Sequence, residues 1–230
     1  MPPKVQKRIR KHGPRKKPSA NVLAVPVLRR LVENAELPGS AVKVLSACSG
    51  MDTECFALHN LKKKFSLEAS CDISPAMARF SASNHMPKMW FDDVTGDDFK
   101  TRAPACDLMV AGFPCQPFSY AGLGQGESDT RGRGTVVWHL LEYAQSRLPA
   151  AIVLENVKGL VDLHPGTLLS IINGISQIRE PGAEEDAYRV VWDLLDSQHF
   201  GLPQRRRRVY IVAQLKSKMQ YSELYSKFQR

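Results

Sequence analysis

The chain has 230 residues, 43% of them hydrophobic and 24% charged, with a formal charge of +9. This length and balance predict one globular domain with a full core, and hardly two. No apolar run approaches the roughly 18 residues of a membrane span, and the N-terminus lacks the apolar core of a secretory signal. We therefore expect a soluble protein that is not secreted and has no membrane partner, placed in the nucleus if eukaryotic and otherwise in the cytoplasm.

Cysteine and histidine usage limits the chemistry further. The five cysteines are odd in number and form no C-x-x-C pair, so neither a disulfide framework nor a zinc site is indicated. The six histidines show no ligand spacing. We therefore expect no metal and a reducing compartment.

The positive charge is concentrated at the start of the chain. Residues 1–30 hold ten Lys or Arg and no acid, which leaves 22 basic against 23 acidic residues elsewhere. Residues 1–40 are therefore expected to form a basic disordered tail, and residues 41–230 a nearly neutral folded domain. The tail would hold phosphates nonspecifically, direct nuclear import, or be a solvated leader without a dedicated partner.

Apolar periodicity predicts strands that alternate with helices. In chain order, strands are expected at 42–45, 65–71, 88–91, 108–111, 151–154, 189–195 and 208–213, and helices at 56–61, 75–85, 135–147 and 167–178. Residues 112–134 have no period and are rich in Gly, Ser, Asp and Arg, which predicts a mobile lid. Residues 214–230 are expected to make one short helix. The alternation predicts an α/β fold, a mostly parallel sheet with helices on both faces.

Polar residues stand where the expected strands end. They are Ser49, Asp72, Asp93, Cys115 and Glu155. Ligands of open parallel sheets bind outside the carboxyl ends of the strands. The sequence therefore predicts one binding rim that gathers these five side chains.

Three strings carry more specific information: GFPCQPFS at 112–119, LENVKGL at 154–160 and QRRRRVYIV at 204–212. A Pro-Cys pair alone is a weak signal, because a lone cysteine is more often a small buried hydrophobe. In this order and spacing, however, the strings resemble the core motifs of the DNA cytosine-5 methyltransferase family, from about Val42 to Ala213. The resemblance implies a Rossmann-like class I methyltransferase fold.

The resemblance also implies a reaction, in which a methyl group passes from S-adenosylmethionine to carbon 5 of a flipped cytosine in DNA. Cys115 would add as a thiolate to carbon 6. Glu155 would supply a proton or a hydrogen bond to ring nitrogen 3. A carboxyl that donates there must be protonated, so burial should raise its pKa. Arg208 would hold the base carbonyl oxygen, Arg206 would support the loop, and either cation would favour the thiolate. Arg205 and Arg207, at the variable positions, are expected to contact solvent or phosphate.

The cofactor residues follow from the same resemblance. Gly50 matches one glycine of the family's first turn, while Cys48 stands where an aromatic is usual. Asp72 would bind the ribose hydroxyls, and Asp93 would accept from the adenine amino group. Either acid alone is more often a cap or turn residue. The full set expected to contact S-adenosylmethionine is Ser49, Gly50, Asp72, Ile73, Asp93, Val94, Pro114 and Val136.

Two alternatives remain open. The family includes a transfer-RNA methyltransferase branch, and a noncatalytic, methyltransferase-like nucleic-acid-binding or regulatory protein would share these motifs. Family members usually continue into a target-recognition region, whereas 17 residues follow Ala213 here. We therefore expect a catalytic domain that is incomplete at its C-terminus, with weak, sequence-tolerant activity on DNA or dependence on a partner chain for recognition.

Overall fold

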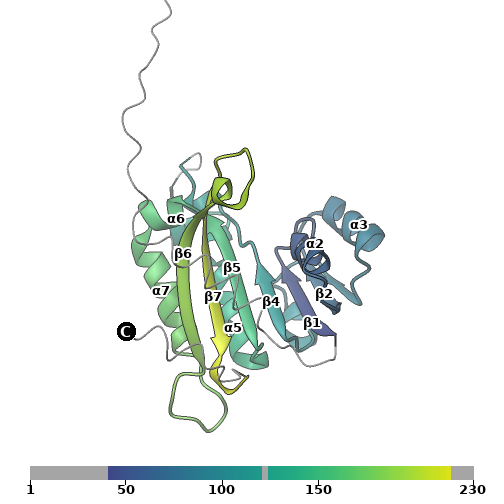
Figure 1. Cartoon of the computed structure of the whole chain (residues 1–230). Coiled ribbons are helices and arrows are strands. Elements are labelled where there is room, and N and C mark those ends of the chain that lie inside the picture. The colour runs from purple at the N-terminus through teal and green to yellow at the C-terminus, as the bar shows by residue number, and fades with distance from the viewer. Residues whose placement is uncertain (1–40, 121–123, 219–230) are drawn as a thin grey trace, which may run out of the picture. The chain divides into compact units, whose positions relative to one another are not determined.

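The computed structural model of the protein describes residues 41–120 and 124–218 (Figure 1). The expected basic tail, the centre of the expected lid at 121–123, and most of the expected C-terminal helix lie outside the described residues. The rest forms a seven-stranded sheet in the order β3-β2-β1-β4-β5-β7-β6. Its strands are β1 (Val42–Ala47), β2 (Phe65–Cys71), β3 (Met89–Phe91), β4 (Leu108–Ala111), β5 (Ala151–Val157), β6 (Tyr188–Asp196) and β7 (Arg207–Leu215).

Pairing in this sheet is parallel except at β7. Strands β1 to β5 pair in parallel, whereas β7 runs antiparallel to both of its neighbours, β5 and β6. The prediction of a mostly parallel sheet is therefore confirmed. In residues 41–120 and 124–218, six α-helices accompany the strands: α2 (Thr53–Asn60), α3 (Pro75–Asn84), α4 (Asp97–Arg102), α5 (Val136–Arg147), α6 (Gly159–Asp162) and α7 (Pro165–Ser176).

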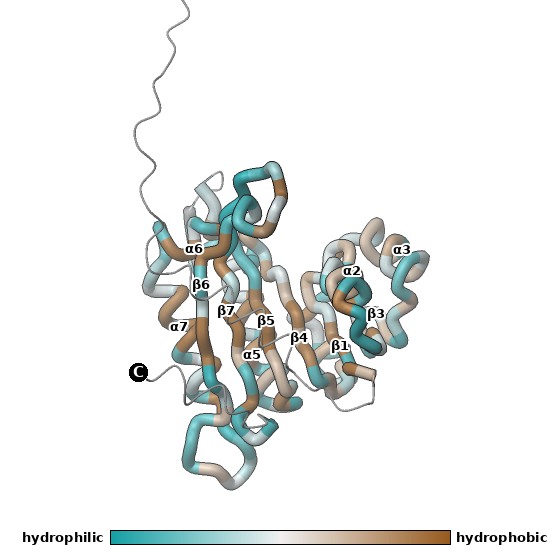
Figure 2. The backbone as a smooth tube through the Cα atoms, in the orientation of Figure 1, coloured by the Kyte–Doolittle hydropathy of each residue, from teal (hydrophilic) through white to brown (hydrophobic). Residues whose placement is uncertain are grey.

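Two apolar clusters lie on opposite faces of the sheet, because successive side chains of a strand alternate between faces. Val42 and Val44 of β1 pack in a small cluster with Leu58 of α2. Leu45 and Ala47 of the same strand belong to the main core, which also takes Phe99 of α4, Leu140 of α5 and Ile171 of α7. Figure 2 shows these apolar stretches along the central strands. Helices on both faces are thus confirmed.

Short elements are where the structure departs from the sequence prediction. Helices α4 and α6 were not predicted, because six and four residues span too few turns to show a helical period. The described part of the expected lid is also not structureless. It contains three 3₁₀ turns, η2 (Gln116–Phe118), η3 (Gly126–Ser128) and η4 (Arg133–Thr135).

Local contacts explain why part of the expected lid is ordered. The Asp129 carboxylate accepts hydrogen bonds from the Arg133 backbone N–H at 3.1 Å and from its guanidinium at 2.7 Å and 3.0 Å. The Arg133 hydrogen bonds outweigh desolvation and lower the pKa of Asp129 to about 2. A Cβ on Gly134 would stand 2.1 Å from the Gly126 carbonyl oxygen, so only glycine allows η3 and η4 to pack this closely.

Candidate active site

Cys115 lies on the turn that follows β4. It caps η2 and accepts a hydrogen bond on its carbonyl oxygen from the Phe118 N–H at 3.0 Å. Phe113 and Phe118, on either side of it, are buried and meet edge to face at 6.1 Å between ring centroids. These rings anchor both ends of the turn in the core, while the Cys115 side chain stays partly exposed at the rim.

The string LENVKGL holds this cysteine turn in place. The buried Asn156 side chain donates from Nδ2 to the Phe113 carbonyl oxygen at 3.1 Å, and its Oδ1 accepts from the Val157 N–H at 2.8 Å. A Cβ on Gly159 would stand 2.0 Å from the Phe118 carbonyl oxygen. No local sequence pattern predicted a role for Asn156 or Gly159. The structure makes them the two supports of the Cys115 turn.

We predict that Gly159→Ala displaces the cysteine turn. The added methyl group would clash with backbone, which cannot move aside as a flexible side chain can. We expect a loss of about 1–3 kcal/mol in the free energy of unfolding and up to about 10²-fold less activity. Chemical denaturation and a methyl-transfer assay would measure both. The matched control is Gly166→Ala in α7, where a Cβ meets open space, so equal damage in both variants would contradict the prediction.

Glu155 faces Arg208 across the β5–β7 pair. The Arg208 Nε lies 2.9 Å from Glu155 Oε1, and the two side chains are 22% and 30% exposed. Burial raises the pKa of Glu155, and the positive charges of Arg208 and Arg206 only partly offset this. The direction agrees with the sequence argument that this carboxyl must hold a proton. Arg208 also donates to the Arg207 carbonyl oxygen at 2.8 Å.

Gly112 is where the cysteine turn, Glu155 and the first turn of the sheet meet. A Cβ there would stand 3.7 Å from Glu155 Oε2 and 3.9 Å from the Cys48 carbonyl oxygen. The carboxyl ends of β1, β4 and β5 therefore deliver their turns to one place, as parallel neighbours must. The structure thus brings the expected nucleophile turn and the expected acid together.

Three of the four consecutive arginines pair with one of two carboxylates. Arg208 pairs with Glu155, whereas Arg205 and Arg207 approach Asp196 Oδ2 through Nε at 3.6 Å and 3.2 Å. Arg205 and Arg207 were expected to contact solvent or phosphate, and the structure adds a contact of each with Asp196. The physical reason is strand alternation, which places Arg207 opposite Asp196 in the β6–β7 register.

The turn after β1 is held by Asp72. The Gly50 N–H donates to Asp72 Oδ2 and the Ser74 N–H to Asp72 Oδ1, both at 2.9 Å. Gly50 has φ +53°, a conformation that favours glycine, and a Cβ there would meet no atom within 4 Å. Beside it, Ser49 Oγ is buried without a hydrogen-bond partner among the described residues. The turn therefore presents an open backbone and an unsatisfied hydroxyl.

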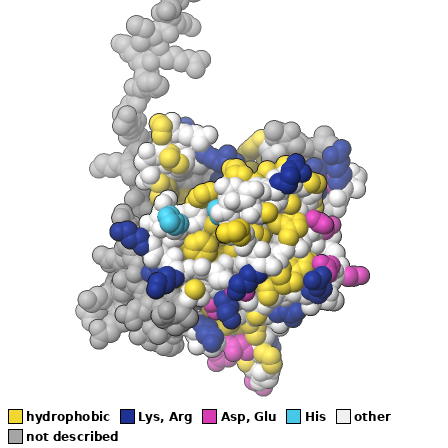
Figure 3. Space-filling model, turned by 90° about the vertical axis from the view of Figure 1, so that its right-hand side faces the viewer, with side chains coloured by type: hydrophobic (Ala, Val, Ile, Leu, Met, Phe, Trp, Pro, Cys, Tyr) yellow, Lys and Arg dark blue, Asp and Glu magenta, His cyan; other side chains and the backbone are white. Residues whose placement is uncertain are grey.

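The other expected cofactor residues separate into exposed and buried ones. Ile73 is 79% exposed, and the exposed Asp93 accepts from the Thr95 N–H at 2.8 Å. Val94 and Val136 are buried in the main core, so little of either side chain is open to a ligand. Pro114 is partly buried. On the side of the molecule that carries α3, hydrophobic side chains occupy broad areas between scattered Lys and Arg (Figure 3).

Asp72 and Asp93 both influence the pKa of the Cys48 thiol. Burial, followed by the negative charges of Asp72 and Asp93, raises the pKa of Cys48 to about 12. A thiol in this setting stays protonated at neutral pH, and only the thiolate is a good nucleophile. The cysteine at the first turn is therefore unsuited to nucleophilic chemistry.

Residues 41–120 and 124–218 contain neither a metal-ligand cluster nor a membrane-spanning helix. No group of three or more His, Cys, Asp or Glu in these ranges is placed to share a metal ion. Within the same ranges, no helix has the length and apolar character needed to cross a membrane.

The strand order with an antiparallel β7 defines the Rossmann-like class I methyltransferase fold. Similar solved structures include Dnmt2 methyltransferase of S. pombe, with a TM-score of 0.59, 21% identity, and coverage of 83% of this chain and 54% of that one. The methyltransferase EhMeth of Entamoeba histolytica gives a TM-score of 0.59 at 18% identity, covering 77% and 54%. At these identities the likeness shows the fold alone.

Sequence relatives identify the family. The family model for C-5 cytosine-specific DNA methylase matches residues 42–229, and the chain belongs to this family. The Type II methyltransferase M.BanI of Aneurinibacillus aneurinilyticus is 36% identical over 178 residues, covering 77% of this chain and 39% of the relative. M.NgoBV of Neisseria gonorrhoeae is 31% identical over 185 residues, covering 77% and 42%. The chain thus spans about two fifths of the length of these relatives.

Proposed function

We propose that residues 41–230 form a catalytic domain that transfers a methyl group from S-adenosylmethionine to carbon 5 of cytosine in DNA. The observation that carries this proposal is the pairing of two turns. The turn of Cys115 after β4 and the end of β5, where burial raises the pKa of Glu155, are joined by the Asn156 to Phe113 hydrogen bond of 3.1 Å. A nucleophile and an acid fixed on neighbouring strands suit covalent attack on a ring.

Cys115 begins the proposed reaction as a thiolate. Its sulfur forms a bond to carbon 6 of a flipped cytosine, and the ring electrons move toward nitrogen 3, which takes a proton or hydrogen bond from Glu155. Carbon 5 thereby becomes nucleophilic and takes the methyl group, which the bound cofactor supplies from its sulfonium. Loss of the carbon 5 proton to a base then expels the Cys115 thiolate, and nitrogen 3 returns any proton it took to Glu155, which restores the ring.

Glu155 and the arginines have matching roles in this scheme. Because burial raises the pKa of Glu155, the carboxyl holds its proton to a higher pH than a solvated one does. Arg208, whose Nε lies 2.9 Å from Glu155 Oε1, would hold the base carbonyl oxygen next to the acid. Arg206 lies close enough to influence the pKa of Glu155, and we assign it to support of the cysteine turn.

The first turn of the sheet fits the cofactor. Ser49 Oγ offers a buried hydroxyl with no partner among the described residues, and the space beside Gly50 is open. Asp72 retains acceptor capacity after its two backbone hydrogen bonds, since each carboxylate oxygen accepts more than one. We assign Asp72 to the ribose hydroxyls, with Asp93 and the exposed Ile73 at the adenine.

We predict that Asp72→Ala weakens S-adenosylmethionine binding by about 1–3 kcal/mol, the cost of leaving ligand polar groups without a partner. Asp72 also holds the Gly50 turn, which adds to the effect. Calorimetric titration would measure the affinity, and thermal unfolding without cofactor would separate damage to the fold. Asp97→Ala, at the exposed start of α4, serves as the control. Unchanged affinity in Asp72→Ala would place the cofactor elsewhere.

The whole proposal is tested by incubating the purified chain with labelled S-adenosylmethionine and DNA, and then analysing nucleosides for labelled 5-methylcytosine. A parallel reaction with transfer RNA separates the two substrate classes. Label in DNA cytosine supports the proposal, and label only in transfer RNA overturns its substrate. Binding of cofactor and DNA with no label in either nucleic acid would favour a noncatalytic, methyltransferase-like role.

A further inference from the structure

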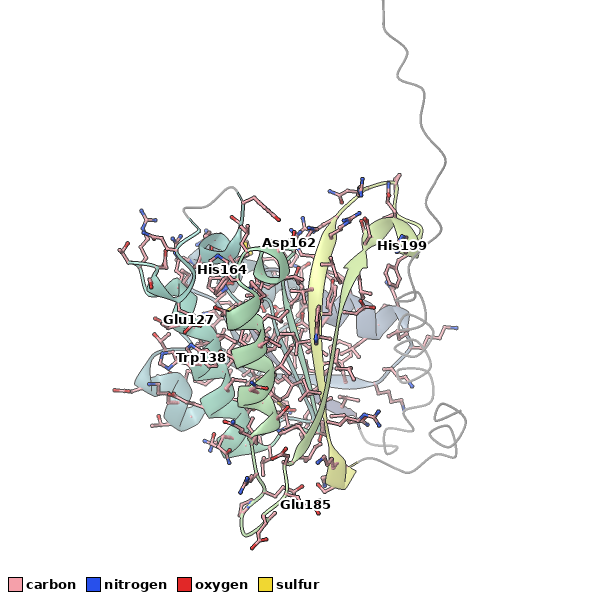
Figure 4. The ribbon with its side chains drawn as sticks, turned by 90° about the vertical axis from the view of Figure 1, so that its left-hand side faces the viewer. Glu127, Trp138, Asp162, His164, Glu185 and His199 are labelled. Atoms are coloured by element: carbon pink, nitrogen blue, oxygen red, sulfur yellow. The ribbon has the colours of Figure 1, made fainter. Side chains whose placement is uncertain are left out.

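An open cleft of about 490 Å³ lies beside the Glu155–Arg208 pair, with Tyr120, Lys158, Arg205, Arg207 and Arg208 among its lining residues. Its walls are the segment after η2, the turn from β5 into α6, and the turn from β6 into β7. Figure 4 shows Asp162 of α6 and His199 of the β6–β7 turn at one end of the molecule and Glu185 at the other. Gly159 lines the cleft and also packs against the Phe118 carbonyl oxygen, so the cleft adjoins the Cys115 turn.

The three arginines that line the cleft contact two different carboxylates. Arg208 lies opposite Val157 in the β5–β7 register and contacts Glu155. Arg207 lies opposite Asp196 in the β6–β7 register and contacts that residue instead. The arginines at the variable positions therefore belong to a different carboxylate from the one proposed to act on the base.

Asp196 is a nearly buried anchor for these two arginines. Its side chain is 8% exposed, while those of Arg205 and Arg207 are 65% and 39% exposed. Both contacts to Asp196 use Nε, and a guanidinium has five N–H donors. The terminal amino groups thus stay available, on side chains whose orientation is already set.

Hydrogen bonds also fix the backbone of the turn between β6 and β7. The Ser197 N–H donates to the Arg206 carbonyl oxygen, and the Arg206 N–H donates to Ser197 Oγ, both at 3.1 Å. The Gln198 N–H donates to Asp196 Oδ1 at 3.3 Å. Burial opposes ionisation of Asp196, but this hydrogen bond and that of Arg207 outweigh it and lower its pKa. Asp196 is therefore a carboxylate at neutral pH, able to hold both cations.

We propose that Arg205 and Arg207, positioned by Asp196, form a binding site for a DNA backbone phosphate next to the base pocket. A planar guanidinium matches phosphate oxygens, and arginines ordered before binding lose less side-chain freedom when the ligand arrives. This proposal depends on the proposed function in one respect: the bound DNA strand would present its cytosine to Glu155. Phosphate contacts fix the register of a strand, which base chemistry needs.

The first test measures how DNA binding by the full chain depends on salt. A fluorescent 20-base-pair duplex rich in cytosine is titrated by anisotropy at several salt concentrations. Each neutralised phosphate contributes about 0.9 to the slope of log affinity against log salt, so Arg205→Gln with Arg207→Gln, which removes this one phosphate site, should reduce that slope by about 1. Lys100→Gln with Arg102→Gln removes the same charge from the surface of α4, where Arg102 is 63% exposed and paired with Asp98. An equal slope change in both double variants would overturn the site.

The second test uses the sign of the effect of Asp196→Asn. Removing a carboxylate makes the protein more positive, so general attraction to DNA would tighten binding. If Asp196 positions the arginines, binding weakens instead, several-fold at fixed salt. Tighter or unchanged binding would refute the positioning role. Should this variant fail to fold, the exposed Arg205 and Arg207 variants still decide the proposal.

These outcomes can be separated from failure of the proposed function, because binding needs no methyl transfer. A smaller salt slope in Arg205→Gln with Arg207→Gln, together with no 5-methylcytosine from the unaltered chain, keeps the phosphate site and rejects the activity. Normal 5-methylcytosine formation with an unchanged slope keeps the activity and rejects the phosphate site.

Discussion

Replacing Cys115 by serine is expected to lower methyl transfer by about 10³-fold or more, on the scale seen when a covalent nucleophile is removed. A serine hydroxyl at neutral pH is far less nucleophilic than a thiolate, so the bond to carbon 6 does not form. Cofactor affinity should change little, because the Ser49–Gly50 turn follows β1 and is held by Asp72. A single-turnover assay and a calorimetric titration would measure the two quantities separately.

Cys106→Ser is the matched control for this prediction. Cys106 is buried and accepts a hydrogen bond from the Tyr143 hydroxyl at 3.3 Å, which serine can also accept. DNA that contains 5-fluorocytosine adds a direct readout, because fluorine blocks the final elimination and should trap an adduct on Cys115. Turnover that survives in Cys115→Ser, or an active protein that forms no adduct, would rule out the covalent route.

The sequence was sufficient for elements that have a clear local signal. Leu108–Ala111 and Pro75–Asn84 were found within a residue at each end, because a buried strand and a proline-started helix leave clear local signals. Helix α6 was not predicted, because four residues are too few to show a helical period. The 3₁₀ turns of 112–134 were not predicted either, because part of their order comes from contacts with backbone that is distant in the sequence. Gly159 against the Phe118 carbonyl oxygen is one such contact.

The same limit applies to the site. Motif order alone pointed to Cys115 and Glu155, and the structure places their turns side by side. The hydrogen bond by which Asn156 holds the Cys115 turn was not predicted, because its partner Phe113 is 43 residues away. No local sequence pattern predicts that pairing. Asp196 left a weak signal that went unused: an acid at the end of one strand, before a turn that leads into four arginines.

A structural role and a ligand-binding role are compatible in Asp72. The sequence allowed a cap or turn role beside the ribose role. The structure shows the turn role directly, since Asp72 Oδ1 accepts from the N–H of Ser74, which is the N-cap of α3. A carboxylate that organises the turn at the ends of β1 and β2 is also placed to meet a ligand there, so the structural role supports the proposed one.

Glu155→Gln is expected to lower the rate of methyl transfer by about 10²–10⁴-fold, the usual worth of a positioned acid. Glutamine keeps the shape of the side chain and an oxygen for the Arg208 Nε contact of 2.9 Å, but it has no proton to release to ring nitrogen 3. Glu142→Gln on α5, a 61% exposed residue, is the control and should leave the rate unchanged.

The pH dependence of the same variant tests the protonated state of Glu155. Burial raises the pKa of this carboxyl in the folded protein, so any rate that needs its proton falls as pH rises through that raised pKa. In Glu155→Gln this decline should be absent. A decline of equal size in both proteins would assign it to another group.

At high pH, Glu155→Gln should raise the free energy of unfolding, although it lowers the rate of methyl transfer. A carboxyl whose pKa is raised on folding contributes fully below its unfolded pKa, and that contribution is lost as pH rises through the folded value. Above that value the unaltered chain must keep a poorly solvated carboxylate, whereas glutamine has no charge to desolvate. Glu155→Gln should therefore be more stable than the unaltered chain at pH 8–9 and no more stable at pH 4, by denaturant titration at each pH. A variant that is both inactive and less stable at high pH would show that Glu155 serves the fold as an ion-pair partner of Arg208, not the reaction as an acid.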